Sequence, residues 1–297
     1  DTVYLNSSGI ATILASDINN SSTDTCGIDS ININGFSTMN LDCSHVNSNQ
    51  EAILNVFDAS GNTDSCIGWV TVMDTFPPIA NCRNLSIYLD GTGMATVHAD
   101  SLNNGSIDLC TGSNLTFEIA GSSQTTLDCS NINTNPNLIV LTVIDSFGNS
   151  STCNSFVSVW DTIAPIASCT NASIYLNNSG IATLYAADLS SGSWDNCGVT
   201  DSFVTVFGNA FTTYDCTNIF TNQSATLIVE DAQGNTASCV ERVDVIDTIN
   251  PVALCEASII AQLNAAGVVT LLPATIDSTS TDNCGLANYL INNASSA

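Results

Sequence analysis

The strongest constraint on this chain is that its sequence repeats itself. An Asp-Thr pair followed shortly by proline recurs at Asp74-Thr75, Asp161-Thr162 and Asp247-Thr248, each time after an alternating apolar run. The three pairs stand 87 and 86 positions apart. A fixed period of this length indicates an array of one structural unit rather than a single large domain.

Cysteines keep the same period. Each interior unit holds four of them at closely matched spacings: Cys82, Cys110, Cys129 and Cys153, then Cys169, Cys197, Cys216 and Cys239. The first unit has Cys26, Cys43 and Cys66, and the last has Cys255 and Cys284. The 13 cysteines are therefore four per unit, less those missing from the two end units.

These patterns predict four repeats. Repeat 1 spans residues 1–74 without its leading end, repeat 2 spans 75–161, repeat 3 spans 162–247, and repeat 4 is an incomplete unit at 248–297. We expect the natural protein to continue in both directions, or its end units to be completed by neighbouring molecules. The Asp-Thr-x-x-Pro junctions are too short for flexible linkers, so consecutive repeats should touch.

Within a repeat, apolar and polar residues alternate over short runs, as in Leu85–Leu89, Leu138–Ile144 and Phe156–Trp160. This period of two is typical of β-strands with one buried face. Turn residues such as Asp90-Gly91 and Gly148-Asn149 break the runs about every ten positions. The sequence predicts an all-β chain of tandem immunoglobulin-like, Greek-key β-sandwich repeats of about 86 residues, each with about seven strands.

Composition restricts the partners and the compartment. The chain has 28 acidic residues and only Arg83 and Arg242 as cationic ones, a formal net charge of -26. Such a charge disfavours nucleic acid and anionic membranes as partners. No run of eighteen apolar residues is present, so we expect no membrane insertion. Regularly spaced cysteines point to disulfides and to an extracellular location.

Acidic residues recur at matched loop positions. In an immunoglobulin-like sandwich, the first strand leaves from the end that carries the B–C and F–G loops, so the linker, B–C and F–G residues of one repeat should converge there. The expected sets are Asp74, Asp108, Asp145 and Asn149 in repeat 2, Asp161, Asp195, Asp231 and Asn235 in repeat 3, Asp24, Asp58 and Asn62 in repeat 1, and Asp247 and Asp282 in repeat 4.

Converging carboxylates without a lysine anywhere in the chain should repel one another unless a cation intervenes. Hard oxygen ligands on loops suit calcium, which takes 6–8 oxygens at roughly 2.3–2.6 Å. The sequence therefore predicts calcium sites at the inter-repeat junctions. The competing interpretation is that the same Asp, Asn and Gly residues form tight turns only.

Four cysteines per repeat allow three pairings. Sandwich topology favours the first cysteine with the last, because the first and last strands run side by side, and the two middle cysteines with each other. The expected pairs are Cys82–Cys153 and Cys110–Cys129, with Cys169–Cys239 and Cys197–Cys216 at matched positions and Cys26 with Cys43 in repeat 1. Zinc is not expected, because no Cys-x-x-Cys pair occurs.

Nothing in the sequence predicts an enzyme. His45 and His98 stand where other repeats have Asn, Leu or Tyr, and no repeat offers a Ser, His and Asp set. Glu118, Glu230 and Glu241 do not recur between repeats, which argues against a glycosidase carboxylate pair.

Several short motifs in fixed order resemble hyalin-type (HYR-like) repeats of Bacteroidota surface proteins. They are Asp74-Thr75-Phe76-Pro77-Pro78 with Cys82, Asp195-Asn196-Cys197-Gly198, and Asp231-Ala232-Gln233-Gly234-Asn235 with Cys239. The resemblance covers essentially the whole chain and implies an adhesive or scaffolding repeat at a bacterial surface, with no defined ligand. Cys110 is followed by Thr111-Gly112 rather than by glycine, and Asn250 precedes the linker proline, so junction chemistry could vary between repeats.

Glycosylation is a further expectation. Asp-Ser/Thr followed by an aliphatic residue resembles the O-glycosylation signal of Bacteroidota and occurs at Ser30, Ser101, Thr162 and Thr248. Asn-x-Ser/Thr triplets make Asn84, Asn104, Asn114 and Asn171 candidate acceptors as well.

We therefore expect a structural component of an extracellular filament or adhesive stalk that self-associates or continues the same array. One alternative is a module that binds glycans or cell surfaces through exposed loops such as the one with Trp194. The other is a set of spacer repeats in a larger secreted enzyme.

Overall fold

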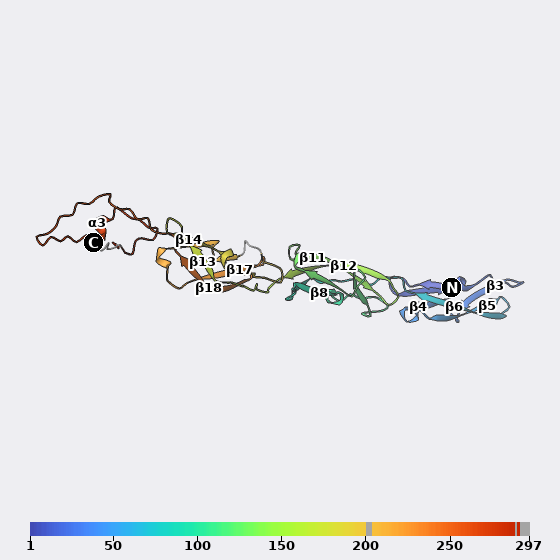
Figure 1. Ribbon diagram of the computed structural model, residues 1–297. Coiled ribbons are helices and arrows are strands. Elements are labelled where there is room, and N and C mark those ends of the chain that lie inside the picture. Colours follow the sequence, from blue (N-terminus) through green and yellow to red (C-terminus); the bar gives the residue numbers. More distant parts are fainter. Residues whose placement is uncertain (200–203, 289, 292–297) are drawn as a thin grey trace. The chain divides into compact units, whose positions relative to one another are not determined.

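The computed structural model describes residues 1–199, 204–288 and 290–291. Within these ranges repeats 1, 2 and 3 each fold as a small β-sandwich, drawn in successive colours in Figure 1. The chain divides into two compact units, residues 1–89 with 94–160 and residues 90–93 with 161–297. None of the helical segments in the described ranges has the length and apolarity that a membrane span requires.

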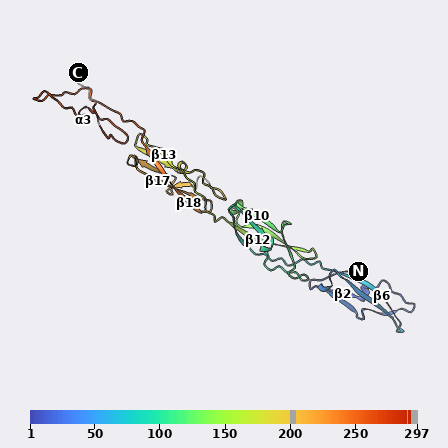
Figure 2. The same cartoon turned by 60° about the horizontal axis from the view of Figure 1, so that its bottom comes forward.

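Repeat 2 illustrates the topology (Figures 1 and 2). One sheet has four strands in the order β7-β12-β11-β9, and β8 pairs with β10 in a second, two-stranded sheet. The first strand is parallel to the last, Leu85 lying opposite Val157 and Tyr88 opposite Trp160. The bounds are β7 Leu85–Tyr88, β8 Met94–His98, β9 Thr116–Ile119, β10 Gln124–Asp128, β11 Asn137–Ile144 and β12 Ser150–Trp160.

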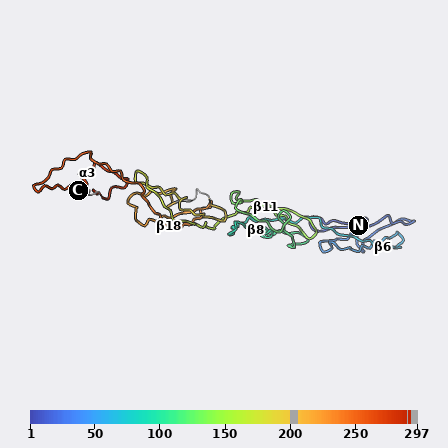
Figure 3. Tube along the Cα trace, in the orientation of Figure 1, coloured from blue at the N-terminus to red at the C-terminus, as the bar shows by residue number. Residues whose placement is uncertain are grey.

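Repeats 1 and 3 have the same strand orders, β1-β6-β5-β3 with β2-β4 and β13-β18-β17-β15 with β14-β16. The chain trace in Figure 3 follows both segments. The bounds in repeat 1 are β1 Thr2–Tyr4, β2 Ile10–Leu14, β3 Ile28–Ile33, β4 Thr38–Asp42, β5 Asn49–Asp58 and β6 Thr63–Met73. Those in repeat 3 are β13 Ala172–Tyr175, β14 Ile181–Tyr185, β15 Val204–Val206, β16 Phe211–Asp215, β17 Gln223–Glu230 and β18 Thr236–Ile246.

This topology confirms the predicted class: the chain is a tandem array of immunoglobulin-like β-sandwiches. Repeats 1 and 2 have six strands each rather than about seven. In repeat 2 a two-residue turn, with Ala120 at φ 49° and Gly121 at φ 81°, joins β9 almost directly to β10 and leaves no room for another strand.

Alternation within the strands builds the cores. In β12, Val157 and Val159 are fully buried, whereas Phe156 and Trp160 on the opposite face are exposed. Val157 packs with Leu141 and Val143 of β11 in the core of repeat 2. Repeats 1, 2 and 3 each have a core of their own, as expected for a unit that folds around its two sheets.

Short helical turns join the strands. The bounds are α1 Ala15–Ile18, α2 Ala186–Leu189, α3 Pro273–Ile276 and the 3₁₀ turns Cys43–His45, Ala99–Leu102, Cys129–Ile132 and Cys216–Asn218. In repeat 2 we distinguish the two ends of the sandwich. Asp128, which precedes Cys129, pairs with Met94 at the start of β8, so Cys129 lies at what we call the turn end. Asp108 and Cys110 follow the far end of β8, at what we call the acidic end.

Cysteine pairing differs in part from expectation. Cys82–Cys153 and Cys169–Cys239 form as predicted, beside the parallel first and last strands. The pairs Cys110–Cys129, Cys197–Cys216 and Cys26–Cys43 are wrong, because Cys43 bonds to Cys110 and Cys216 bonds to Cys284. The physical reason is that the two middle cysteines of a repeat lie at opposite ends of its second strand. Four cysteines bond instead to a cysteine of the adjacent repeat: Cys43, Cys110, Cys216 and Cys284. Three others are unpaired and exposed: Cys26, Cys66 and Cys255.

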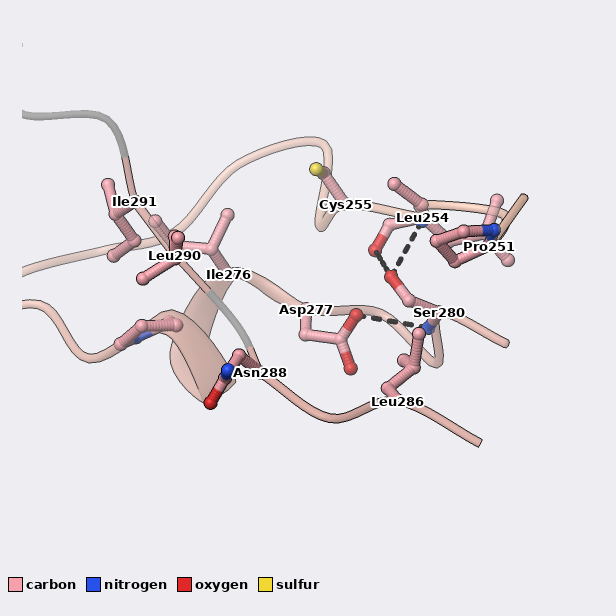
Figure 4. Close-up of a pocket in the computed structure, with 12 residues that line it drawn as sticks. Pro251, Leu254, Cys255, Ile276, Asp277, Ser280, Leu286, Asn288, Leu290 and Ile291 are labelled. Atoms are coloured by element: carbon pink, nitrogen blue, oxygen red, sulfur yellow. Dashed lines mark hydrogen bonds between the residues drawn. The ribbon is translucent and has the colours of Figure 1, made fainter. Parts of the chain in front are cut away.

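Residues 248–291 contain α3 and two isolated bridges but no strand among those described. Two apolar side chains of this stretch, Ile260 and Leu290, are almost fully exposed, at 96% and 90%. Figure 4 shows Leu254, Leu286, Leu290 and Ile291 around a pocket there, with Ser280 donating to Asp277.

Candidate metal centre

Repeat 2 brings three predicted aspartates together at its acidic end. Asp74 comes from the linker, Asp108 from the loop between β8 and β9, and Asp145 from the turn between β11 and β12. One carboxylate oxygen from each lies within 4.8 Å of the others. Segments far apart in the sequence thus converge on one point, as the immunoglobulin-like topology requires.

The β11–β12 turn is built around Asp145. Its Oδ1 accepts from the backbone N–H groups of Phe147 and Asn149, each at 2.8 Å. Gly148 adopts φ 91°, which a glycine reaches without steric cost. Asn149 Nδ2 donates to Asp145 Oδ2 at 2.8 Å and to the Asp74 carbonyl oxygen at 3.2 Å. Asn149 therefore ties this turn to the linker.

Local backbone bonds also fix the other two carboxylates. Asp108 Oδ1 accepts from the N–H groups of Cys110 and Thr111, each at 2.8 Å. Asp74 Oδ1 accepts from Phe76 N at 3.0 Å. Each aspartate of the cluster thus has one oxygen held by backbone N–H groups close to it in sequence, and Asp145 also has its second oxygen held by Asn149 Nδ2.

The cluster is buried and electrostatically unsatisfied. Asp74, Asp108 and Asp145 are only 8%, 4% and 5% exposed, and Asp74 Oδ2 is buried without a hydrogen-bond partner. Burial raises the pKa of Asp74 above its ordinary value, and the charges of Asp108 and Asp145 raise it further. A buried, unpaired carboxylate oxygen costs free energy unless a cation or a donor meets it.

Repeat 3 repeats the arrangement with Asp161, Asp195 and Asp231, again within 4.8 Å. Asn235 Nδ2 donates to Asp231 Oδ2 at 2.7 Å and to the Asp161 carbonyl oxygen at 3.2 Å. Asp161 Oδ2 and Asp195 Oδ1 are both buried without a partner. Burial, with the charges of Asp161 and Asp231, raises the pKa of Asp195.

The remaining predicted residues do not complete a group of three. In repeat 1, Asn62 bonds to Asp58 as its counterparts do, and Asp24 Oδ1 accepts from Cys26 N. In repeat 4, Asp282 Oδ1 accepts from Cys284 N and its Oδ2 is buried without a partner, while Asp247 Oδ1 accepts from Ile249 N.

The donor set fits a hard divalent cation. The cluster offers carboxylate oxygens only, with no thiol or imidazole. Arg83 donates to the Ser101 carbonyl oxygen and Arg242 pairs with Asp244, so no cationic side chain of the chain neutralises either cluster. Oxygen-only sites on turns are those that calcium or magnesium take in proteins.

One residue of the junction was missed at the sequence level. Asn283 Nδ2 donates to Asp247 Oδ1 at 3.1 Å and to the Asn177 carbonyl oxygen of the preceding repeat at 3.4 Å. Asn196, at the matched position, donates to Asp161 Oδ1 at 3.2 Å. The signal was available, because Asp-Asn-Cys-Gly occurs at 195–198 and again at 282–285.

The candidate glycosylation residues lie at the surface or in strands. Ser30, Thr162, Thr248, Asn104 and Asn114 are exposed. Ser101 Oγ donates to the His98 carbonyl oxygen. Asn84 and Asn171 are exposed as well and immediately precede β7 and β13, where Oδ1 accepts from Phe156 N and Arg242 N respectively.

Solved structures similar to this chain include tandem immunoglobulin and cadherin domains. The I67–I69 fragment of titin matches with a TM-score of 0.33 and 11% identity over 83% of this chain and 95% of that one. Sidekick-1 immunoglobulin domains 1–4 match at 0.28 and 10%, over 82% and 73%. Protocadherin gamma B7 cadherin domains 1–4 match at 0.30 and 13%, over 80% and 70%. Neither a family model nor a curated protein sequence matches the chain.

Proposed function

We propose that the chain is a structural part of an extracellular filament or adhesive stalk, in which calcium at the acidic end of each repeat stiffens the junction to the repeat before it. The carrying observation is the recurrence of a buried cluster of three carboxylates with unpartnered oxygens, Asp74 Oδ2 in repeat 2 and Asp161 Oδ2 in repeat 3. A turn without a ligand needs neither the convergence nor the burial.

Electrostatics favour an ion over an empty cluster. Three charges within 4.8 Å repel one another, and their burial weakens the screening by water. A divalent ion would turn this repulsion into attraction and would supply the missing partner of Asp74 Oδ2. We assign Asp74, Asp108 and Asp145 as direct ligands, with Asn149 as the residue that holds Asp145 to the linker.

The mechanical consequence follows from where the ligands come from. Asp74 and Asp161 lie on linkers, whereas the other two aspartates of each cluster belong to loops of the following repeat. An ion bound by all three would fasten the linker to that repeat and remove its freedom to bend. Charge also disfavours self-association of the chain at -26 unless cations are present.

Disulfides support the proposed compartment, because such bonds persist in oxidising surroundings. The proposed partners are further repeats of the same kind, and the HYR-like motifs favour a bacterial cell surface. Glycans on the candidate Ser, Thr and Asn residues would add bulk and solubility without changing the junctions.

Isothermal titration of the full chain with calcium tests the proposal. We expect two ions per chain, one for each cluster of three aspartates, and a higher melting temperature in calcium than in chelator. Magnesium at equal concentration should stabilise less, because it demands a stricter octahedral geometry and dehydrates reluctantly. A melting curve that does not change between calcium and chelator would refute the proposal.

A second candidate is glycan binding through Trp194. Its backbone is fixed by two hydrogen bonds to Ile166, of 2.8 and 3.1 Å, while its side chain is 53% exposed. A rigidly held, exposed indole can stack on a sugar ring. Binding to a glycan array that Trp194→Ala abolishes and Trp69→Ala preserves would support this role; no binding by the parent chain would exclude it.

A further inference from the structure

The Cys43–Cys110 disulfide joins repeat 1 to repeat 2, with the two Cα atoms 5.0 Å apart. Cys43 begins the 3₁₀ turn that follows β4, at the turn end of repeat 1. Cys110 lies in the loop between β8 and β9 of repeat 2, which also contains Asp108 and which we call the acidic loop. Cys216–Cys284 joins repeat 3 to repeat 4 in the same way, with Cα atoms 5.3 Å apart. The bond is thus a recurring feature of the junctions.

The loop cysteine and the cluster aspartate form one local structure. Asp108 Oδ1 accepts from the N–H group of Cys110 itself, two residues further on. Asp282 and Cys284 repeat this contact at 2.9 Å, and Asp195 and Cys197 at 2.8 Å. Whatever holds the loop cysteine in place therefore also holds the carboxylate.

The preceding repeat provides a firm anchor. Cys110, although part of repeat 2, packs with Cys43 against the core of repeat 1. The 3₁₀ turn with Cys43 is capped by Asp42, whose Oδ1 accepts from Ser44 N and Ser44 Oγ. In repeat 3, Cys216 and Cys284 likewise pack against the core. The acidic loop is thus fastened to a rigid body outside its own repeat.

We propose that the inter-repeat disulfide is a positioning element of the metal centre: by holding Cys110, it pre-organises Asp108, so that cation affinity and the Cys43–Cys110 bond are thermodynamically linked. This inference rests on the proposed function. Without the bond the cation would have to order the loop itself, which lowers affinity. The linkage is reciprocal, so a bound cation protects the bond.

The test compares two double variants of the full chain in an Asp195→Asn background, which removes the second cluster. Cys43→Ser with Cys110→Ser breaks the inter-repeat bond, and Cys82→Ser with Cys153→Ser breaks the bond within repeat 2. The two bonds span 67 and 71 residues, so their loss should raise the entropy of the unfolded chain by similar amounts. Calcium affinity is measured by calorimetry and folding by circular dichroism.

We expect the first variant to bind calcium about tenfold more weakly, a usual size for coupling between sites, and the second to stay within about twofold of its parent. Equal affinities in parent and first variant would overturn the positioning role while leaving the metal site standing, and so would an equal loss in both variants. A parent that binds no calcium would overturn the proposed function and this inference with it.

A second measurement uses the unmutated chain and does not depend on the variants folding. A small dithiol reduces the Cys43–Cys110 bond, becoming a cyclic disulfide as the two protein sulfurs take up two electrons and two protons. Trapping of the freed thiols at intervals follows each bond separately. Calcium should slow reduction of Cys43–Cys110 severalfold and leave Cys82–Cys153 unchanged; equal rates with and without calcium would contradict the linkage.

Discussion

Asn149 and Asp74 lie 75 residues apart in the sequence, yet Asn149 Nδ2 donates a hydrogen bond of 3.2 Å to the Asp74 carbonyl oxygen. Asn235 and Asp161 form the same bond, also at 3.2 Å, in repeat 3. In repeat 1, Asn62 Nδ2 bonds to Asp58 Oδ2 alone. The comparison separates two roles of the asparagine side chain: a bond within its own turn, which all three repeats have, and a bond to the linker carbonyl, which only Asn149 and Asn235 form.

Asn149→Ala should therefore destabilise repeat 2 more than Asn62→Ala destabilises repeat 1. The first substitution removes donors from the buried Asp145 carboxylate and from a linker carbonyl, at a cost of about 1–3 kcal/mol. The second removes a bond to the exposed Asp58 carboxylate, which water can replace, so it should cost less. Urea unfolding curves of the two variants and the parent measure the difference, and equal midpoints would show that the linker bond contributes nothing.

Mild acid should stabilise the cation-free chain. The pKa values of Asp74 and Asp195 are raised above 3.8 by burial. A raised pKa favours the protonated, folded form, so its contribution is greatest at pH below 3.8 and is lost as the pH rises through the folded-state pKa. Melting temperature in chelator should thus increase as the pH is lowered from neutral toward about 4.

The opposite trend begins only at lower pH. Exposed aspartates such as Asp42, Asp128 and Asp215 have pKa values lowered by hydrogen bonds from Ser or Thr. Their contribution is lost as the pH falls from 3.8 through their folded-state pKa values. In calcium, the melting temperature should instead fall as the pH is lowered from neutral toward about 4, because protons displace the ion. A flat profile in chelator between neutral pH and about 4 would contradict the raised values.

The repeat fold was predictable because each strand is encoded locally. Val157 and Val159 alternate with polar or exposed neighbours, and the period fixes where the next copy begins. Cys82–Cys153 was predictable for a related reason: the topology places the first and last strands side by side. The convergence of Asp74, Asp108 and Asp145 followed from the same argument.

What the sequence did not show was which repeat a cysteine reaches. Cys110 and Cys129 are 19 positions apart in the sequence, a spacing that suggests a pair. They lie at opposite ends of the sandwich, however, separated by the length of the five-residue strand β8. Only packing reveals that Cys43 of the previous repeat lies nearer. In the same way, the spacing did not indicate that Asn149 would act mainly as a donor.

Gly180→Ala should loosen the junction between repeats 3 and 4. A Cβ atom there would lie 2.7 Å from Cys216 Sγ and 2.8 Å from the Asn283 carbonyl oxygen, and φ is 70°. We expect a loss of roughly 2 kcal/mol or more. Gly121→Ala is the matched control, because its φ of 81° is equally unfavourable but nothing lies within 4 Å. If the melting temperature falls equally in both variants, backbone strain alone would explain the loss, and the contacts with Cys216 and Asn283 would contribute nothing.

Asp74→Asn should have opposite effects with and without calcium. In chelator, it removes one of three mutually repelling buried charges and gives Asp74 Oδ2 a replacement that can donate, so the melting temperature should rise by a few degrees, roughly 2–4 °C for each kcal/mol gained. In calcium, the variant lacks a ligand and should lose the stabilisation that the ion gives the parent. Asp64→Asn changes the net charge equally at an exposed strand position outside the cluster, so it should shift both curves little. Because a turn aspartate without a ligand would be destabilised by the substitution in both buffers, an Asp74→Asn chain that melts lower than the parent in chelator would favour the turn interpretation over the metal centre.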